Sequence, residues 1–229
     1  MSDPYKVVLL GESGVGKTCI IAQFTNGVFD PDTVTSLTAQ FIRKAITFED
    51  EKSVTFDIWD TAGQEKYRSM AKIFYKDAKA VILVYDITNE KSFEEMKNYW
   101  YQQVKQQGDS DVIVAIAANK SDLYEDKKVD DTQGEEFAKG INAIFASTSA
   151  KNDSGIKVLF ENIAQKILDP NFDFSANEEK KKEDYKKKKQ LEAKKNAQNA
   201  NANNNAAPNS GKVKLQAGNQ KKENKKGGC

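Results

Sequence analysis

The sequence predicts an α/β fold built on a layered, mixed sheet, followed by a tail of different composition. Two near-continuous apolar runs, AVILVYDI and VIVAIAAN, are typical of central strands that are covered on both faces. Such runs alternate with segments of helical apolar spacing through residues 5–168, which is the pattern of an α/β sheet. After Asp169 the chain becomes rich in Lys, Glu and Asn, and Pro170 ends the last helical pattern.

The predicted elements can be taken in chain order. The first apolar run, YKVVLLG, predicts a strand, and the next segment, GKTCIIAQF, has the apolar spacing of a helix. Two strand candidates follow, FIRKAITFED and SVTFDIWD. The polar turn between them, Asp50–Lys52, predicts a hairpin and therefore one antiparallel edge strand. Residues 91–107, between the two central strands, have helical spacing. AIFAST then predicts a last strand and GIKVLFENIAQKIL a last amphipathic helix.

Composition limits the kinds of chemistry that this chain can perform. Its 229 residues include no histidine and only two cysteines, Cys19 and Cys229. This excludes a zinc cluster and a histidine-based catalytic centre, and it argues against a disulfide framework. A reducing, cytosolic setting is therefore expected. The first residues, MSDPYK, lack the apolar region of a signal peptide, and no stretch approaches the roughly 18 apolar residues of a membrane-spanning helix.

Charge is distributed unevenly along the chain. Residues 175–229 contain fifteen lysines, no arginine and six acidic residues, which gives a net charge of +9, whereas residues 1–174 carry −8. The tail also includes the low-complexity stretch NAQNANANNNAAPNS. We therefore expect two parts with different roles, a folded domain at 1–174 and a disordered, Lys/Asn-rich tail at 175–229.

The first predicted strand runs into a phosphate-binding motif. Gly11, Gly14, Gly16, Lys17 and Thr18, within GESGVGKT, match G-x-x-x-x-G-K-[ST] between a strand and a helix. Glycines allow backbone N–H groups to converge on an anion, and the following helix presents its N-terminus to the same phosphates. Lys17 is predicted to bind the β- and γ-phosphates, and the Thr18 hydroxyl is predicted to bind Mg²⁺.

A second motif, DIWDTAGQE, supplies groups for the metal and for hydrolysis. Asp60 ends an apolar strand, where it is expected to hold Mg²⁺ through a water. The Gly63 N–H group is expected to sense the γ-phosphate, and Gln64 to orient the attacking water. An aspartate at a strand end is commonly a turn residue, but Lys17 and Thr18 upstream favour the metal-binding role.

Two tetrads, NKSD and TSAK, predict the recognition of guanine. The Asp122 carboxylate can accept two N–H groups from guanine, a pair that adenine does not offer. Asn119 is expected to hold the base edge or a neighbouring loop, and the Lys120 stem to lie along the ring face. The Ala150 N–H group is expected to meet guanine O6, with Lys151 over the base. Both tetrads follow predicted strands, at the edge where open α/β sheets bind their ligands.

Together, GESGVGKT, WDTAGQE, NKSD and TSAK resemble the Ras superfamily of small GTPases, and LVYDIT, IWDTAGQEKYRSM and KNYW resemble its Rab branch. The resemblance covers about residues 5–168. It implies the P-loop small-GTPase fold, a six-stranded mixed sheet flanked by five helices. It also implies a GTP/GDP switch with slow GTP hydrolysis that recruits effectors in intracellular vesicle traffic. Two alternatives are a Ras-like signalling GTPase outside vesicle traffic and a nucleotide-binding scaffold with little hydrolysis.

The resemblance extends to individual residues. It implies a catalytic role for Gln64. Phosphate binding is assigned to Ser13, Gly14, Val15, Gly16, Lys17, Thr18 and Gly63. Guanine binding is assigned to Phe29, Asn119, Lys120, Asp122, Ser149, Ala150 and Lys151. Mg²⁺ binding is assigned to Thr18, Ser36 and Asp60, and the effector surface to Phe41, Trp59 and Phe74. For Phe29 and Trp59, the simpler alternative is a packing role.

One departure from the family concerns Ser36. Rab proteins usually have a threonine at this point of the first switch, and aligning Phe41 with the family's switch phenylalanine puts Ser36 there. Serine keeps the hydroxyl but lacks the methyl group that restricts its rotamer. We therefore expect a looser GTP-bound switch, which γ-phosphate-dependent effector binding by a Ser36→Thr variant would test.

Arginine placement predicts slow intrinsic hydrolysis. Arg43 and Arg68 are the only arginines in the chain, and neither precedes Ser36, where an arginine acting in cis would lie. Arg68 is the exception to test, although a salt bridge in the second switch is the commoner role. Since an arginine finger raises the rate by roughly 10³ to 10⁵, an activating protein is expected to supply one. The resemblance implies further partners, namely an exchange factor, effectors, a prenylation escort and a GDP-dissociation inhibitor. A monomer is expected.

The chain ends KKGGC, which looks like a prenylation site at Cys229 although it is not a C-a-a-X box. Rab tails commonly end in paired cysteines, so a single lipid chain is expected here. One chain anchors a protein only marginally, and the pairs Lys221–Lys222 and Lys225–Lys226 are expected to add attraction to an anionic membrane. The expected location is the cytoplasmic face of an endosomal, Golgi or vesicle membrane, in exchange with the cytosol. Nucleic-acid binding is not expected, since neither aromatic residues nor arginines interleave with the lysines.

Overall fold

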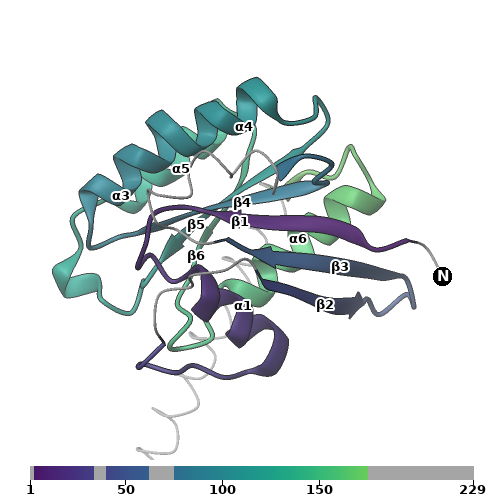
Figure 1. Cartoon of the computed structure of the whole chain (residues 1–229), viewed down its shortest axis with the longest axis horizontal. Coiled ribbons are helices and arrows are strands. Elements are labelled where there is room, and N and C mark those ends of the chain that lie inside the picture. Colours follow the sequence, from purple (N-terminus) through teal and green to yellow (C-terminus); the bar gives the residue numbers. More distant parts are fainter. Residues whose placement is uncertain (1–2, 34–39, 62–74, 175–229) are drawn as a thin grey trace, which may run out of the picture. The chain divides into compact units, whose positions relative to one another are not determined.

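The computed structural model describes residues 3–33, 40–61 and 75–174, which form a six-stranded sheet with helices on both faces (Figure 1). The order of strands in the sheet is β2-β3-β1-β4-β5-β6. The strands are β1 (Tyr5–Leu10), β2 (Gln40–Thr47), β3 (Ser53–Asp60), β4 (Ala80–Asp86), β5 (Ile113–Asn119) and β6 (Ile144–Ser147).

The pairing of the strands confirms the predicted mixed sheet. β1 pairs in parallel with β3 and β4, and β5 pairs in parallel with β4 and β6. β2 alone is antiparallel, to β3, across a tight turn in which the Phe48 N–H group donates to the Lys52 carbonyl at 2.9 Å. Every residue of β4 is buried, as expected for a central strand covered on both faces.

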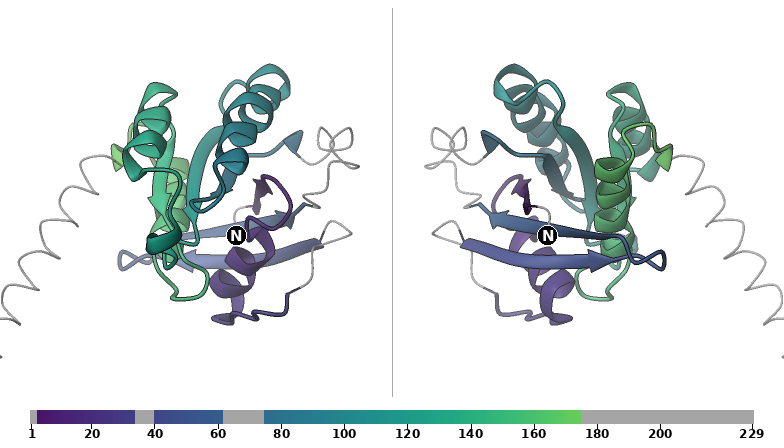
Figure 2. Two further views of the ribbon diagram at one scale, coloured as in Figure 1. Left: turned by 90° about the vertical axis from the view of Figure 1, so that its left-hand side faces the viewer. Right: turned by 90° about the vertical axis from the view of Figure 1, so that its right-hand side faces the viewer.

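The helices form two layers, one on each face of the sheet (Figures 1 and 2). They are α1 (Lys17–Asn26), α5 (Asp131–Gly140), α6 (Ile156–Leu168) and a long run made of α3 (Glu90–Glu95), η2 (Met96–Trp100) and α4 (Tyr101–Gln107). A short 3₁₀ turn, η3, spans Tyr124–Asp126. The described part of the chain thus contains four long helical runs. The resemblance implied a fifth helix, and residues 62–74 lie outside the described ranges.

Two apolar clusters join these layers. Val7 and Leu9 belong to the cluster shared with α1 and α6, whereas Val8 and Leu10 belong to the cluster shared with α3–α4 and α5. This division follows from the geometry of a strand, in which successive side chains point to opposite faces. β1 is therefore apolar at four consecutive positions, and this buried end lies where the phosphate-binding motif begins.

Two helical features were not predicted from the sequence. α5 has only two apolar side chains, Phe137 and Ala138, so its apolar periodicity is weak. A capping box starts it, in which the Asp130 N–H group donates to Gln133 Oε1 at 3.0 Å. The second feature is η2, a π-helical turn inside the long helix, where the Tyr101 N–H group donates to the Met96 carbonyl. π turns of this kind occur often at functional sites.

Gly134 allows α5 to lie close to the sheet. A Cβ atom at this position would collide with the Tyr85 hydroxyl and with the Phe145 ring. We expect Gly134→Ala to lower the free energy of unfolding by about 1–3 kcal/mol through overpacking, although alanine is the better helix former by about 1 kcal/mol. Chemical denaturation would measure the difference. Gly140→Ala, in the same helix with open space around it, is the matched control and should be neutral or stabilising.

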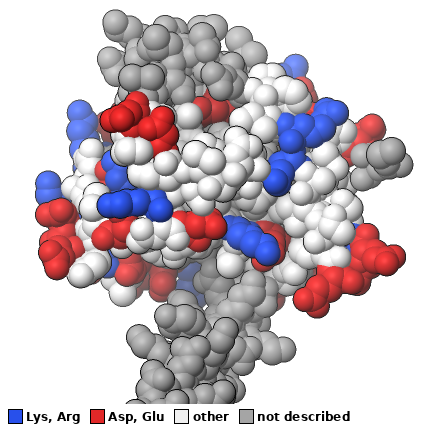
Figure 3. Space-filling model, turned by 90° about the horizontal axis from the view of Figure 1, so that it is seen from below, with Lys and Arg blue, Asp and Glu red and all other residues white. Residues whose placement is uncertain are grey.

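The surface of the described residues is charged and mixed in sign. Figure 3 shows acidic and basic side chains interspersed over one face of the molecule. Arg43 and Asp57 form a bidentate ion pair across β2 and β3, with an Nε–Oδ1 distance of 2.7 Å, and Lys79 pairs with Asp111 at 2.6 Å. In the described ranges, none of the helices is long and apolar enough to cross a bilayer.

Candidate functional site

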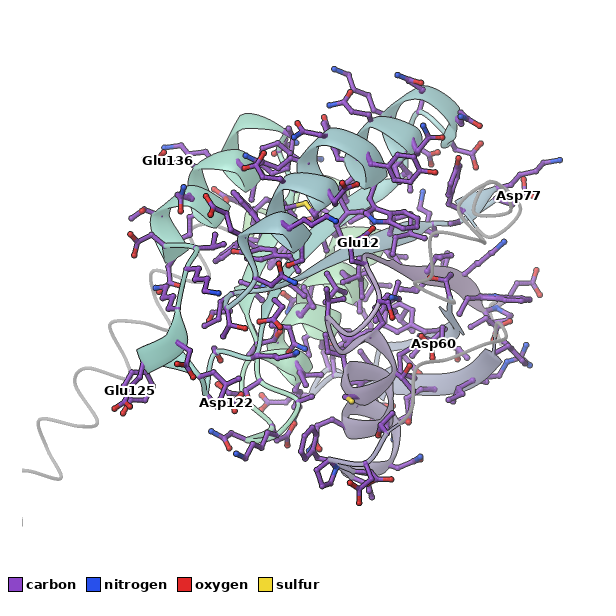
Figure 4. The ribbon with its side chains drawn as sticks, turned by 60° about the vertical axis from the view of Figure 1, so that its left-hand side comes forward. Glu12, Asp60, Asp77, Asp122, Glu125 and Glu136 are labelled. Atoms are coloured by element: carbon purple, nitrogen blue, oxygen red, sulfur yellow. The ribbon has the colours of Figure 1, made fainter. Side chains whose placement is uncertain are left out.

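Polar side chains that follow or end several strands meet at one edge of the sheet. β1, β3, β4, β5 and β6 run in the same direction, so their carboxyl ends share this edge. Figure 4 shows Asp60, from β3, on one side of the start of α1 and Asp122, which follows β5, on the other. This is the edge at which open α/β sheets bind their ligands.

The loop between β1 and α1 has a backbone that only glycine adopts easily. Gly14 has φ 79° and Gly16 has φ 95°. A Cβ atom at Gly11 would collide with the Val84 carbonyl, so the loop also lies tightly against β4. Gly16 is the N-cap of α1 and offers no side chain to the first turn of the helix. The N–H groups at the start of α1 therefore lack a side-chain cap from their own N-cap residue, which suits an anion.

Lys17 is held inside this loop. Its side chain is almost fully buried, and its ammonium group donates to the carbonyl oxygens of Gly11 and Glu12, both at 2.9 Å. Burial lowers the pKa of Lys17 from 10.5 to about 8, and the carboxylates of Asp60 and Glu12 raise it in part. Two carbonyl groups thus orient the ammonium within the loop, as expected of a phosphate-binding lysine.

The lowered pKa of Lys17 predicts opposite pH dependences for folding stability and for nucleotide affinity. Between pH 8 and 10.5 the unfolded chain binds more protons than the folded, nucleotide-free protein, so folding stability should rise with pH by at most about 3 kcal/mol. Nucleotide affinity should fall over the same pH window, because phosphates bind the charged form and binding takes up a proton. Urea unfolding and calorimetric titration with GDP in two buffers would measure the two effects.

Lys17→Met is the control for this pH dependence, because methionine has a similar length and does not titrate. The difference between wild type and this variant isolates Lys17 from other groups that titrate at alkaline pH. If the stability of both proteins followed the same pH profile, the lowered pKa of Lys17 would be wrong.

The two predicted metal-binding residues in the described part of the chain lie in contact. The Thr18 hydroxyl donates to Asp60 Oδ2 at 2.7 Å, and Asp60 is 3% exposed. The next residue, Thr61, is fixed by its own hydroxyl, which donates to the Leu9 carbonyl at 2.6 Å. A hydroxyl and a carboxylate are the hard oxygen ligands that Mg²⁺ prefers, so these residues fit the ion. The third predicted ligand, Ser36, lies outside the described residues.

Asn119 connects the two halves of the site. Its Nδ2 donates to the Val15 carbonyl in the phosphate-binding loop at 2.8 Å, and its Oδ1 accepts from the Thr148 hydroxyl at 3.2 Å. Asn119 is 1% exposed. Of the two roles predicted for it, the geometry corresponds to holding the neighbouring loop. A Cβ atom at Gly16 would collide with Asn119 Nδ2, so this contact also requires glycine at that position.

The predicted base-reading residues also come together. The Ser149 hydroxyl donates to Asp122 Oδ1 at 2.6 Å, and the Asn152 N–H group donates back to Ser149 Oγ at 3.1 Å. Ser149 and Ala150 are both buried, whereas Lys151 is exposed. NKSD and TSAK, which are separated by 25 residues in the sequence, therefore form one structural unit. Their contact with guanine stays a prediction.

Lys120 has a partner that sequence reasoning missed. Its ammonium lies 2.7 Å from Asp86 Oδ2, at the end of β4. Asp86 is itself held by Thr88, whose N–H and hydroxyl groups donate to Oδ1 at 2.8 and 2.7 Å. Lys120 also has a left-handed backbone, with φ 65°. The signal for Asp86 was available, because it ends an apolar strand in the same way as Asp60 and Asn119.

The remaining predicted residues lie around this centre. Phe29 is partly buried and packs against the apolar cluster under α1, which corresponds to its packing alternative. Phe41 and Trp59 lie on paired strands with ring centroids 5.7 Å apart, and Phe41 is 48% exposed. Ser13 and Gly14 are exposed at the loop tip, and Val15 is buried. The predictions for Ser36, Gly63, Gln64, Phe74 and Cys229 fall outside the described ranges.

Comparison with known proteins agrees with this geometry. Residues 6–169 match the model of the Ras family. The chain is 42% identical over 162 residues to Ras-related protein Rab-22A from Homo sapiens, an alignment that covers 71% of this chain and 82% of the relative. It is 38% identical over 164 residues to Ras-related protein Rab-30 from Homo sapiens, which covers 72% of this chain and 80% of the relative.

These matches favour neither a signalling GTPase outside vesicle traffic nor a scaffold without hydrolysis. The matched region contains every motif from which nucleotide binding was predicted, and it ends one residue after α6. The chain belongs to the Ras family, in its Rab branch, and is a small GTPase that acts as a switch in vesicle traffic.

Proposed function

We propose that GTP and GDP bind along the carboxyl edge of the sheet, with the phosphates at the loop before α1 and guanine beside Asp122. The observation that carries this proposal is the contact between Thr18 and Asp60 next to the buried Lys17 ammonium. A magnesium ion and a phosphate group need these three groups within a few ångströms of one another. The 2.6 Å contact between Ser149 and Asp122 supports the position of the base.

Binding would rely on charged and polar groups that the fold holds at this edge of the sheet. The ammonium of Lys17 and the N–H groups at the start of α1 neutralise the phosphates. Thr18, Ser36 and Asp60 would hold Mg²⁺, which would supply further positive charge against the phosphates. Asp122 would accept two N–H groups of guanine, while Ser149 orients its carboxylate. Asn119 would keep the phosphate and base regions in register through the Val15 carbonyl.

Hydrolysis would use Gln64 to orient water and the Gly63 N–H group to contact the γ-phosphate, as the family resemblance implies. Among the described residues the only arginine is Arg43, and its guanidinium is bound to Asp57 by two hydrogen bonds. That arginine is therefore engaged in β2 and β3 rather than at the phosphates. We therefore expect slow intrinsic turnover and dependence on an activating protein that supplies the charge of an arginine finger. Arg68, which lies outside the described ranges, is the exception to test.

The proposed output of the switch is an effector surface around Phe41, Trp59 and Phe74. In support of it, Phe41 is about half exposed although it packs against Trp59, and Lys6 lies 5.3 Å from the Trp59 ring centroid. Aromatic side chains are enriched in protein interfaces relative to the rest of the surface. An exchange factor would load GTP and effectors would bind the GTP-bound form.

We also propose a division of labour between the domain at 1–174 and the tail at 175–229. A lipid on Cys229 and the basic pairs before it would hold the domain on the cytoplasmic face of an internal membrane. A prenylation escort and a GDP-dissociation inhibitor would deliver and retrieve a monomeric protein. Comparing the location of the tagged full chain with that of its Cys229→Ser variant tests this part, since the variant should remain in the cytosol.

Single-turnover hydrolysis tests the nucleotide function. The full chain, loaded with GTP and Mg²⁺, should release phosphate slowly, and excess ATP should not displace the GTP. Gln64→Leu should retain GTP binding and lose most of the hydrolysis. Equal affinity for ATP and GTP would contradict the proposed base recognition, and undiminished hydrolysis by the Gln64 variant would contradict the proposed catalytic role.

A further inference from the structure

The phosphate-binding loop contains an acidic residue, Glu12, immediately after Gly11. A carboxylate near a triphosphate is unfavourable, because like charges a few ångströms apart repel each other strongly in a partly buried site. The motif itself leaves this position open to any residue. The position of the Glu12 side chain therefore decides whether it weakens nucleotide binding.

The structure shows a specific partner for this carboxylate. Glu12 Oε1 accepts a hydrogen bond from Trp100 Nε1 at 3.0 Å, across 88 positions of the sequence. At the same time the Glu12 backbone carbonyl accepts from the Lys17 ammonium at 2.9 Å. Figure 4 shows Glu12 just beneath the long helical run α3–η2–α4. Glu12 thus connects this helical run to the Lys17 ammonium, which is proposed to bind phosphate.

Trp100 is a buried donor. It is 2% exposed and is among the largest fully buried side chains of the described residues. Its ring packs edge-on against Tyr99 at a centroid distance of 5.1 Å, and Met96 and Val104 bury the same side of the helix. Trp100 is also the last residue of the π turn η2. A wide turn re-aims the side chains that it carries, and such turns recur at functional sites.

We propose that Trp100 is a positioning residue for the nucleotide: its indole N–H holds the Glu12 carboxylate on the helix side of the loop, so that the loop presents Lys17 and its amides, and not a negative charge, to the phosphates. The proposal rests on the nucleotide site proposed above. It explains why an acidic side chain is compatible with an anion-binding loop, and it assigns a role at the nucleotide site to a buried tryptophan that the sequence marked only as part of the family signature KNYW.

A positioning role for Trp100 predicts a result that a packing role would not produce. Removing the N–H group of Trp100 should release the Glu12 carboxylate, which would then repel the phosphates. The loss of nucleotide affinity should therefore need the charge at position 12. If Trp100 only filled space, its replacement would have the same effect whichever residue stands at that position. A double-mutant cycle separates these two cases, because it subtracts effects that each substitution has alone.

The cycle uses four full-length proteins, namely wild type, Trp100→Phe, Glu12→Ala and the double variant. The measured quantity is the rate of release of a fluorescent GDP analogue in the presence of Mg²⁺. With Glu12 in place, Trp100→Phe should accelerate release by about tenfold or more, the size expected for a hydrogen bond to a charged group. In the Glu12→Ala background the same substitution should change release by less than about twofold. Val104→Ala, which removes volume from the same helix, should leave release unchanged.

Phenylalanine at position 100 also reduces core volume, so a second variant keeps the test independent of folding. Replacing the Trp100 indole with benzothiophene exchanges N–H for sulfur and keeps the shape of the ring. Equal acceleration with and without the Glu12→Ala substitution, or no acceleration by either variant, would overturn the proposal. Wild-type protein that bound no GDP would instead refute the nucleotide site itself, so the two failures are distinguishable.

Discussion

Asp122→Asn should exchange the preference for guanine nucleotides for a preference for xanthine nucleotides, with a change of at least about a hundredfold in relative affinity. The Asp122 carboxylate is proposed to accept two N–H groups of guanine. An asparagine amide offers one donor and one acceptor, which match the 2-oxo group and the N1–H group of xanthine. With guanine, the amide would leave a buried donor facing another donor. Competition of GDP and XDP for the variant measures the exchange.

Ser149→Ala is the matched control for this specificity. It removes the hydroxyl that donates to Asp122 Oδ1 at 2.6 Å and leaves the carboxylate in place. We expect weaker GDP binding with unchanged discrimination against XDP, because orientation is lost while the recognising group stays. A variant with asparagine at position 122 that still preferred GDP would show that another residue reads the base.

Gly16→Ala should abolish nucleotide binding, with a loss of more than about a hundredfold in affinity for GDP. The substitution combines two effects. Gly16 has φ 95°, a left-handed conformation that costs a residue with a side chain about 1–2 kcal/mol. The added Cβ atom would also collide with Asn119 Nδ2, which holds the Val15 carbonyl. The loop would therefore lose its connection to the base-binding side.

Gly27→Ala separates these two effects. Gly27 is also left-handed, with φ 66°, but it lies at the far end of α1 with open space around its α-carbon. It should lower the free energy of unfolding by about 1 kcal/mol and leave GDP affinity unchanged. Equilibrium binding of fluorescent GDP and thermal unfolding of both variants would decide. Equal loss of affinity in the two variants would mean that backbone strain alone accounts for the effect at Gly16.

Much of the fold was predictable because its signals are local. The apolar runs of β4 and β5 and the polar turn at Asp50–Lys52 identify a covered central sheet and one hairpin. α5 was missed for a physical reason. It presents only Phe137 and Ala138 as apolar side chains, and it depends on its capping box and on the close approach of Gly134 to the sheet. Such an approach has no signal in hydrophobic periodicity.

The candidate site, like the fold, has a part that the sequence predicts and a part that it does not. Lys17, Thr18, Asp60 and Asp122 were predicted because each belongs to a contiguous motif at the end of a strand. The contacts that orient them were not predictable, because they join segments far apart in the chain. The ion pair of Lys120 with Asp86 and the hydrogen bond of Glu12 with Trp100 are examples. The residues next to each of these side chains in the sequence do not indicate its partner. The partners are brought together by the order of the strands in the sheet.

The order of strands in the sheet also affects how the protein is made. β1 is the first strand to leave the ribosome, yet both of its neighbours, β3 and β4, are encoded later, and its last register partner is Leu83. Parallel pairing of this kind forms slowly, because distant segments must meet first. Asn119, which holds the Val15 carbonyl, follows later still. A nascent chain therefore cannot complete its nucleotide pocket until well over half of the domain has been synthesised, and truncated products should not trap GTP.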